Sequence, residues 1–430
     1  MPQSESTLLE LPYGRTVQRA VVPAGYDVTF IAPREVPPAD NPLAVVEAAL
    51  ASPIGHVRLA DFRGAESAAI AINDKTRPVP HAQLLPPLLR ELEALGISHE
   101  RITLVIATGT HPVMPPEEYS MILPPEIIAR YPIVCHDALD DASLVALGTT
   151  KRGTPVFINR HYMASDLRLV IGNVEPHQFM GFSGGVKSAA IGLAGKVTVN
   201  HNHALMTDDH ARLGAYGKNP ARQDVEEIGA RIRVDFALNA VLNGQKQIVE
   251  AFAGDPVALM QVAMPRVTEI FQVPVAAPFD LLITSPGGHP KDINLYQSQK
   301  ALAHAALITR PGGGIILCAA CPEGTGSTSY ETWLHEGRFT SHEAVIEQFQ
   351  SEGFRVGPHK AFQISRDAVG RQVWLISEMP PAFVSSLLLQ AAPDLQHALE
   401  AALADLPVGA RIGVMPAANA TIPALLNSGD

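Results

Sequence analysis

Short apolar runs recur along the 430-residue chain, and each ends abruptly in a loop rich in Gly, Pro, Asn, Asp or His. The runs are Ser67–Ile72, Ile102–Ala107, Leu167–Ile171, Leu281–Thr284, Gly314–Leu317 and Ile412–Met415. Continuous apolar runs of this length are typical of strands that are buried on both faces of a parallel sheet. Helix-like stretches lie between them, for example His81–Leu95 and Asn294–Leu307. This alternation predicts an α/β fold with largely parallel sheets.

The pattern changes between Met264 and Ala277, where a long helical stretch ends and a new strand begins. Because 430 residues are many for one domain, we expect two α/β domains. The first covers residues 1–265 and the second covers residues 275–400. The strand-like segment 409–430 is expected to return to the first domain.

Composition and charge exclude several classes of protein. The formal net charge is −11 and no Lys/Arg run is present, which disfavours a nucleic-acid partner but allows a local basic pocket for a small anion. No apolar run is long enough to span a bilayer, and the start of the chain lacks the basic flank and apolar core of a secretory signal. Three cysteines do not make a disulfide framework. We therefore expect a cytoplasmic protein without a membrane partner.

The loops after the first three predicted strands carry side chains that can perform chemistry. NDKTRP contains Asp74 and Arg77, TGTHP contains His111, and GNVEPH contains His177. Ligands bind at the carboxyl ends of parallel strands, so these side chains converge if the strands are neighbours. The alternative is that the loops are ordinary turns, because Asn, Asp, Gly and Pro are turn residues.

The two histidines share a local setting that suits acid–base chemistry. His111 precedes a proline and His177 follows one, and proline stiffens a loop by fixing its own φ. A positioned histidine can act as a general acid or base near neutral pH. Two of them indicate a reaction that needs an acid and a base together, or two bases on opposite faces of one carbon.

GFSGGVKS, from Gly181 to Ser188, resembles a phosphate-binding loop but fails its spacing. A Walker loop has glycine directly before the lysine, whereas Val186 stands before Lys187 here. The turn formed by Ser183, Gly184 and Gly185 is still suited to bind an anion through backbone N–H groups. The alternative is a glycine-rich turn followed by a solvent-facing lysine.

Two further motifs are candidates for ligand contacts. HNH, from His201 to His203, lacks the further ligands of a conventional zinc site, but one of its histidines can complete the coordination of a metal held by an organic cofactor. KDINLYQSQKAL predicts an N-capped helix that presents Tyr296, Gln297 and Lys300, the last two on one face. These three side chains either contact a ligand across a domain cleft or belong to an ordinary exposed face.

In this order, NDKTRP, ATGTHP, EPHxxxGFSGGxK, HNH and DINLYQSQK resemble the motifs of the lactate racemase family. The resemblance extends from LELPYG near the start to MPAANATIP near the end, and the EPHxxxGFSGGxK block is its most specific part. It implies two α/β domains with the active site in the interdomain cleft. It also implies a nickel-pincer nucleotide cofactor, pyridinium-3,5-bisthiocarboxylic acid mononucleotide with nickel, which cofactor-biosynthesis enzymes of the cell supply.

The resemblance also implies roles for particular residues. His111 and His177 match the catalytic histidines, Lys187 matches the lysine that tethers the cofactor, and His203 matches the nickel ligand, with His201 as its rival. The substrate-binding set comprises Arg77, Tyr296, Gln297 and Lys300. Cofactor contacts are expected from Lys187, Asp74, Ser183, Gly184 and Gly185.

The implied activity is an isomerase, a racemase or epimerase that inverts C2 of a 2-hydroxy acid. One histidine takes the hydroxyl proton while hydride moves reversibly to the cofactor, and the other histidine acts on the opposite face. The substrate class includes lactate and larger or more polar 2-hydroxy acids, such as dicarboxylates and sugar acids. Two alternatives stay open: a phosphotransferase that uses GFSGGVKS as a variant phosphate loop, and a non-catalytic protein that binds the cofactor.

Overall fold

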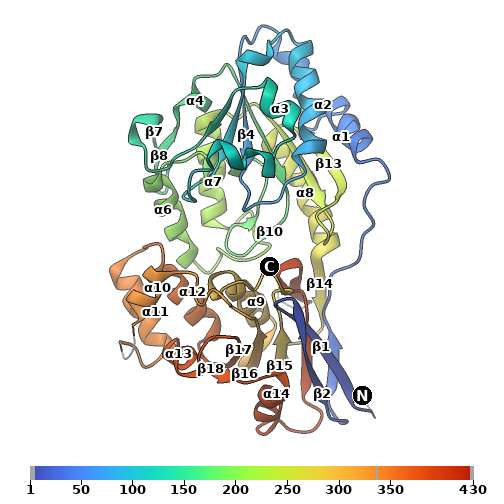
Figure 1. Cartoon of the computed structure of the whole chain (residues 1–430), viewed down its shortest axis with the longest axis vertical. Coiled ribbons are helices and arrows are strands. Elements are labelled where there is room, and N and C mark those ends of the chain that lie inside the picture. Colours follow the sequence, from blue (N-terminus) through green and yellow to red (C-terminus); the bar gives the residue numbers. More distant parts are fainter. Residues whose placement is uncertain (1–4, 336–337, 427–430) are drawn as a thin grey trace. The chain divides into compact units, whose positions relative to one another are not determined.

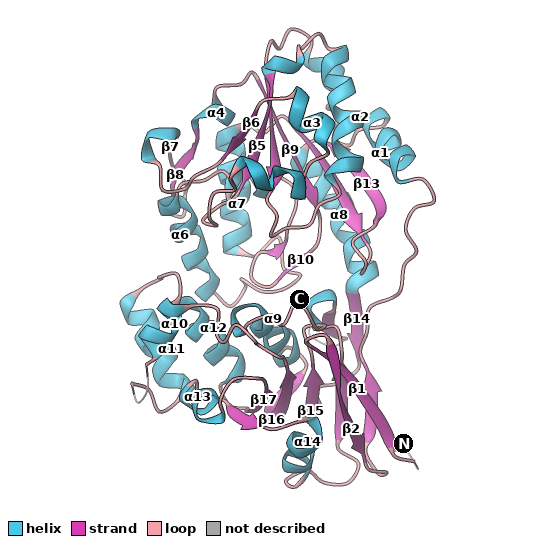
Figure 2. Cartoon of the chain, in the orientation of Figure 1, coloured by secondary structure: helices cyan, strands magenta, loops and turns pink. Residues whose placement is uncertain are grey.

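The computed structural model describes residues 5–335 and 338–426 (Figure 1). Contacts within the chain divide it into two compact units. Unit 1 comprises Met1–Arg34 and Phe271–Asp430, and unit 2 comprises Glu35–Ile270. Each unit contains a six-stranded sheet covered by helices, so both are α/β (Figure 2).

The sheet of unit 2 places three of the predicted strands side by side. Its order is β13-β12-β9-β4-β5-β6, and every neighbouring pair is parallel except β12 with β13. The strands are β4 (Ala68–Asn73), β5 (Ile102–Ala107), β6 (Ile133–Cys135), β9 (Leu167–Asn173), β12 (Phe236–Leu242) and β13 (Ile248–Gly254). The central strand β4 therefore pairs with both β5 and β9.

The side chains of β4 explain how helices cover both faces of this sheet. Ile70 and Ile72 lie in a core that includes α1 (Pro42–Ala51) and α2 (His81–Ala94). Ala69 and Ala71 alternate with them and point to the other face, where α5 (Lys187–Ala190) contacts β4. Because alanine is small, α5 lies close to the strand, and α5 carries the lysine of the glycine loop.

The remaining helices of unit 2 surround the sheet, and two short hairpins extend from it. The helices are α3 (Pro125–Arg130), α4 (Arg160–Met163), α6 (Lys196–Ala204), α7 (Pro220–Ile232) and α8 (Pro256–Phe271), which ends at the unit boundary. The hairpins pair β7 (Leu144–Thr149) with β8 (Pro155–Asn159), and β10 (Pro176–His177) with β11 (Gly181–Phe182).

The sheet of unit 1 is parallel throughout, in the order β18-β17-β16-β15-β19-β3. Its strands are β3 (Asp27–Phe30), β15 (Phe279–Thr284), β16 (Thr309–Cys318), β17 (Gln372–Ile376), β18 (Gln390–Ala392) and β19 (Arg411–Met415). Two further pairs are β1 (Thr7–Tyr13) with β2 (Thr16–Val22), and β14 (Gln272–Val275) with β20 (Ile422–Leu425).

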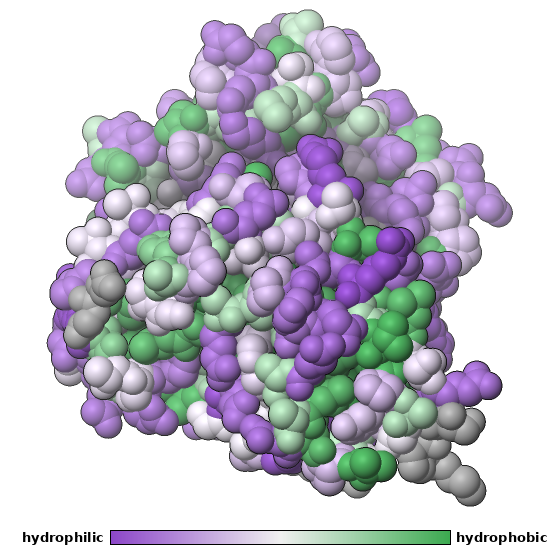
Figure 3. All heavy atoms as spheres, turned by 60° about the horizontal axis from the view of Figure 1, so that its bottom comes forward, coloured by the Kyte–Doolittle hydropathy of each residue, from purple (hydrophilic) through white to green (hydrophobic). Residues whose placement is uncertain are grey.

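Helices and a hairpin cover the two faces of this second sheet. One core joins the sheet to α9 (Leu295–Ala306), α10 (Thr328–Leu334), α11 (His342–Glu352), α12 (Pro358–Ala368) and α13 (Pro381–Ser386). The opposite core joins it to the β1–β2 hairpin and α14 (Leu395–Leu403). The hairpin also exposes Leu8, Val17 and Val21 to solvent. On the face that Figure 3 shows, apolar side chains form patches between polar ones.

The predicted fold class is confirmed, because all six apolar runs lie in or overlap strands and both helical stretches are helices. The units differ from the expected domains at both ends of the chain. Residues 409–430 lie in unit 1, because β19 pairs in parallel with β15. Residues 1–34 also lie in unit 1, because β3 pairs with β19 and the β1–β2 hairpin covers the same sheet. Within residues 5–335 and 338–426, no helix is long and apolar enough to cross a membrane.

Candidate active site

A pocket in unit 2 brings together most of the side chains selected from the sequence. It lies where the loops after β4, β5 and β9 meet, at the carboxyl ends of these neighbouring strands. Its lining includes Asp74, Arg77, His111, His177, Ser183, Gly184, Lys187 and His203. The predicted convergence of the loop residues is therefore confirmed. Gly185 is not among the lining residues, and the lining residues belong to unit 2.

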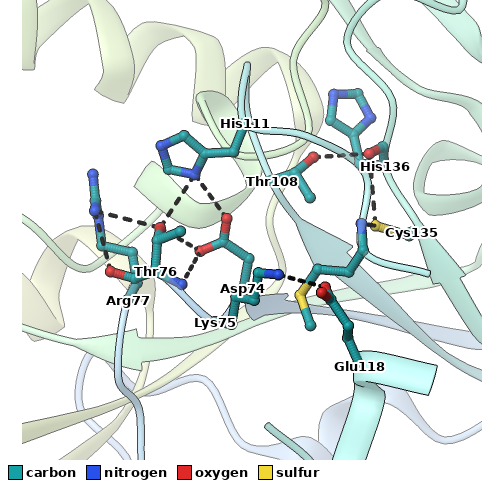
Figure 4. Close-up of polar contacts among 10 residues, drawn as sticks. Asp74, Lys75, Thr76, Arg77, Thr108, His111, Glu118, Cys135 and His136 are labelled. Atoms are coloured by element: carbon teal, nitrogen blue, oxygen red, sulfur yellow. Dashed lines mark hydrogen bonds and ion pairs between the residues drawn. The ribbon is translucent and has the colours of Figure 1, made fainter. Parts of the chain in front are cut away.

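Asp74 orients the ring of His111 (Figure 4). Oδ2 of Asp74 lies 2.7 Å from Nδ1 of His111, and Oδ1 accepts hydrogen bonds from the backbone N–H and the hydroxyl of Thr76 at 3.0 and 2.7 Å. Burial raises the pKa of Asp74, but the hydrogen bond and charge of His111, the Thr76 hydroxyl and Arg77 together lower it below its ordinary value. Since an ionised carboxylate only accepts hydrogen bonds, Nδ1 of His111 carries a proton, and Nε2 is the basic nitrogen of the neutral ring.

His177 has the opposite arrangement of its ring nitrogens. It lies on the short β10–β11 hairpin, where the backbone N–H of Met180 donates to Nδ1 at 3.2 Å. Nδ1 is therefore the acceptor, and Nε2 carries the proton of the neutral ring. Phe179 packs edge-on against His177 at 4.9 Å and against His203 at 5.1 Å between ring centroids. One buried phenyl ring thus separates and orients the two histidines.

Side chains of β12 and α7 form hydrogen bonds to the glycine loop, which is the segment from Gly181 to Ser188. Gly184 and Gly185 have φ of 92° and 58°, a region that favours glycine. The backbone N–H of Gly185 donates to Asn239 Oδ1 at 2.7 Å. The buried guanidinium of Arg222 donates to the carbonyl oxygens of Phe182 and Gly184 at 2.9 and 3.1 Å. The conformation of the loop is therefore set by residues far away in the sequence.

Packing also explains the residue that breaks the Walker spacing. Val186 is buried, and a Cβ placed on Gly229 of α7 would lie only 2.5 Å from the Val186 Cβ. The valine side chain thus occupies the space left by a helix glycine and joins the loop to α7. The helix that begins at Lys187 has only four residues, so the loop differs from a Walker loop in structure as well as in spacing.

Helix α6 distinguishes His203 from His201. Positions two apart on a helix point in nearly opposite directions. The intervening Asn202 is buried and donates to the Ala221 carbonyl oxygen at 2.9 Å and to Asp224 Oδ2 at 3.0 Å. With Asn202 held in this way, His203 lines the pocket and His201 is exposed to solvent.

The predicted substrate contacts Tyr296, Gln297 and Lys300 lie on α9 of unit 1 and are not part of the pocket lining. Asn294 caps the helix as predicted, and Lys300 Nζ donates to Gln297 Oε1 at 2.7 Å, which confirms their common face. Sequence reasoning missed Lys360 of α12, whose buried ammonium lies 4.0 Å from the centroid of the Tyr296 ring. The pairing joins two helices that β16, α10 and α11 separate in the sequence, so no local motif signals it.

The fold and this pocket define an α/β protein in which two histidines from different loops line one pocket. Family models described as the lactate racemase N-terminal domain and C-terminal domain match residues 13–214 and 275–422. The chain belongs to the lactate racemase family, a family of isomerases.

Individual relatives agree with this assignment. The lactate racemases of Thermoanaerobacterium thermosaccharolyticum and Lactiplantibacillus plantarum are each 31% identical to the chain, over 86% of the chain and 88% of the relative. A solved structure of the lactate racemase apoprotein from the former organism has a TM-score of 0.87 and 28% identity, and covers 97% of this chain and 100% of that one. A Thermotoga maritima protein with a TM-score of 0.65 and 16% identity, matching 91% of this chain and 100% of its own, shares the fold alone.

Replacing Arg222 by Met should destabilise unit 2 and loosen the glycine loop. The substitution removes both donors to the loop carbonyls and leaves Glu226, 2.6 Å from Arg222, without its buried partner. Removing one partner of a buried ion pair costs about 3–5 kcal/mol. We expect a loss of this size in urea unfolding, and faster amide hydrogen exchange over residues 181–186.

Arg231→Met on the same helix is the matched control. Arg231 also pairs with a glutamate four residues away, but its side chain is 34% exposed and it does not bond to the glycine loop. A half-exposed pair contributes about 0–1 kcal/mol. Equal losses in the two variants would contradict a specific role for Arg222.

Proposed function

We propose that the protein is a racemase or epimerase that inverts C2 of a 2-hydroxy acid with the help of a nickel-pincer nucleotide. The observation that supports this most directly is the pair of histidines with opposite resting tautomers at one pocket. Neutral His111 presents a basic Nε2, because its Nδ1–H is engaged by Asp74. Neutral His177 presents an Nε2–H, because its Nδ1 accepts from Met180. An inverting reaction needs one group to accept a proton and another to supply it.

The residues of the pocket fit the cofactor that this reaction requires. Within the described residues, no group of three or more His, Cys, Asp or Glu side chains is placed to hold a metal ion. A metal in this pocket therefore needs ligands from a bound organic group, with His203 as the protein ligand. Lys187 supplies a primary amine for covalent attachment to an acid arm, and buried Oδ1 atoms of Asn73 and Asn173, which lack hydrogen-bond partners, are available to ligand donors.

When bound, the cofactor supplies a reversible acceptor for the hydride of C2. The protein residues do the remaining work. Nε2 of His111 takes the hydroxyl proton, and the Asp74 carboxylate stabilises the imidazolium that forms. His177 donates a hydrogen bond to the substrate oxygen through Nε2–H and, as the imidazolium, returns a proton when hydride is added to the opposite face of C2. Both histidines exchange protons with solvent between turnovers. Because the hydride returns to the carbon that it left, the cycle needs no net change of redox state.

Arg77 is the proposed partner of the substrate carboxylate in this pocket. A guanidinium binds a carboxylate through two parallel hydrogen bonds, which fixes the orientation of the acid. In the part of the chain that the structure describes, Arg77 donates only to oxygens of Thr76, at 3.3 and 3.5 Å, and pairs with no carboxylate. The substrate-contacting role of Tyr296, Gln297 and Lys300 stays a prediction.

Single enantiomers should test the activity directly. Cofactor-loaded protein should convert pure L- or D-lactate, or the enantiomers of malate or a larger 2-hydroxy acid, to a mixture of both configurations. Enantiomers have equal free energies, so the end point is racemic from either side. Chiral chromatography measures the conversion.

Two other outcomes are distinguishable. Nickel retention with every acid of the panel inert contradicts the proposed function and identifies a non-catalytic binding protein. ATP turnover with magnesium that persists in His177→Ala identifies a phosphotransferase.

Asp74→Asn should lower kcat while the protein stays folded. A carboxamide offers an N–H to Nδ1 of His111 and thereby favours the wrong tautomer, so the general base is lost. General acid–base catalysis contributes about 10²- to 10⁴-fold, and kcat should fall within that range. Asp166→Asn is the control, because Asp166 also accepts several hydrogen bonds but does so before β9, at the opposite edge of the sheet. Equal kcat losses would contradict the role of Asp74.

His203→Ala should lose nickel from cofactor-loaded protein, whereas His201→Ala should retain it. The reason is geometric, since only His203 lines the pocket and its neighbour is exposed. Metal content by plasma mass spectrometry measures the difference. Retention of nickel in His203→Ala, or loss of nickel from His201→Ala alone, would contradict the assignment of His203 as the nickel ligand.

A further inference from the structure

An ion pair joins the wall of the pocket to a distant hairpin turn. Nζ of Lys246 lies 2.8 Å from Oε2 of Glu175, and the two side chains are 47% and 31% exposed. Glu175 lines the pocket and lies two residues before His177. Lys246 lies in the turn between β12 and β13, outside both segments that the family models match.

The turn that carries Lys246 is unusually well fixed. Lys246 has φ of 62°, a left-handed conformation that is uncommon for a residue other than glycine. Asn243 holds this geometry: its side-chain oxygen accepts from the N–H groups of Gln245 and Gln247, each at 3.0 Å, and its amide donates to Val36. These hydrogen bonds fix the backbone from which the Lys246 side chain extends to Glu175.

Glu175 has a second, backbone role in the site. Its carbonyl oxygen accepts from the N–H of Ser183 at 2.8 Å, which connects the catalytic loop to the glycine loop. Its carboxylate is a negative group in a pocket that also contains Arg77 and Lys187. Burial raises the pKa of Glu175, but Lys246, Arg77 and Lys187 lower it below the ordinary value, so the group is ionised at neutral pH. Glu175 is therefore a competitor of any anionic substrate for the nearby cations.

We propose that Lys246 is a positioning residue that holds the Glu175 carboxylate away from Arg77. Arg77 therefore stays able to bind the substrate carboxylate. The inference rests on the proposed function, because it assumes that the substrate is an anion. A partly exposed ion pair contributes little to folding, so the effect of Lys246 should be found in substrate binding. Without Lys246, Glu175 is free to turn toward Arg77 and neutralise it.

A set of substitutions tests this. Lys246→Met should raise KM for the best 2-hydroxy acid of the panel by about tenfold, the low end of the cost of one lost hydrogen bond to a charged group, with kcat changed by less than about threefold. Lys246→Arg should keep KM near that of the wild type. The double variant Lys246→Met/Glu175→Gln should return KM to within about threefold of the wild type, because a neutral amide does not neutralise Arg77. A merely structural role does not predict this rescue.

Arg266→Met is the matched control. Arg266 pairs with Glu250 of β13 at 2.6 Å, so it anchors the same hairpin through a similar contact, away from the pocket. Its KM should equal that of the wild type. Thermal unfolding of every variant shows whether the protein stays folded.

The outcomes separate this inference from the proposed function. An unchanged KM in Lys246→Met, or no rescue in the double variant, overturns the inference while racemase activity stands. If the wild type does not racemise, binding of L-lactate and L-malate by calorimetry is compared across the same variants. If the Kd values of the variants follow the order expected for KM, the role of Lys246 is supported and only the proposed reaction is contradicted. A protein that binds neither acid overturns both.

Discussion

The parallel pairing of β4 with both β5 and β9 is the constraint on which the site depends. In this arrangement, the loops after three strands begin at the same edge of one sheet. Asp74 follows β4, His111 follows β5 and His177 follows β9, so the side chains meet although more than sixty residues separate the last two. A different strand order would keep each local motif and disperse the pocket.

Charge pairing within the pocket follows from the same arrangement. The protein has a formal net charge of −11, yet its two pocket carboxylates each have a cationic or hydrogen-bonding partner. Asp74 pairs with His111, and Glu175 pairs with Lys246. The pocket lining also contains two cationic side chains, Arg77 and Lys187. An acidic protein thus presents a site that suits an anionic ligand.

The residues that hold the loops of the pocket are harder to identify from the sequence than the residues proposed to act on the substrate. Asp74, Arg77, His111 and His177 stand in short motifs at the ends of apolar runs, so pattern and position were sufficient to select them. Arg222, Asn239 and Lys246 stand in ordinary helix, strand and turn sequence. Each acts on a loop more than thirty residues away, through one or two hydrogen bonds or an ion pair. Such contacts depend on the packing of α7 and β12 and carry no local signature.

The sequence by itself determined the α/β class, the positions of the main strands and helices, and the residue types available for acid–base chemistry, because periodicity and turn composition are local properties. Only the tertiary structure decided the membership of the chain ends. Apolar patterning predicts a strand-like segment in residues 409–430, but hydrogen bonding of β3 and β19 assigns both ends of the chain to unit 1. It likewise decided that His203 lines the pocket and His201 faces solvent, because the burial of Asn202 sets the rotation of α6. Strand partners and helix rotation are set by contacts between distant segments, which no local pattern contains.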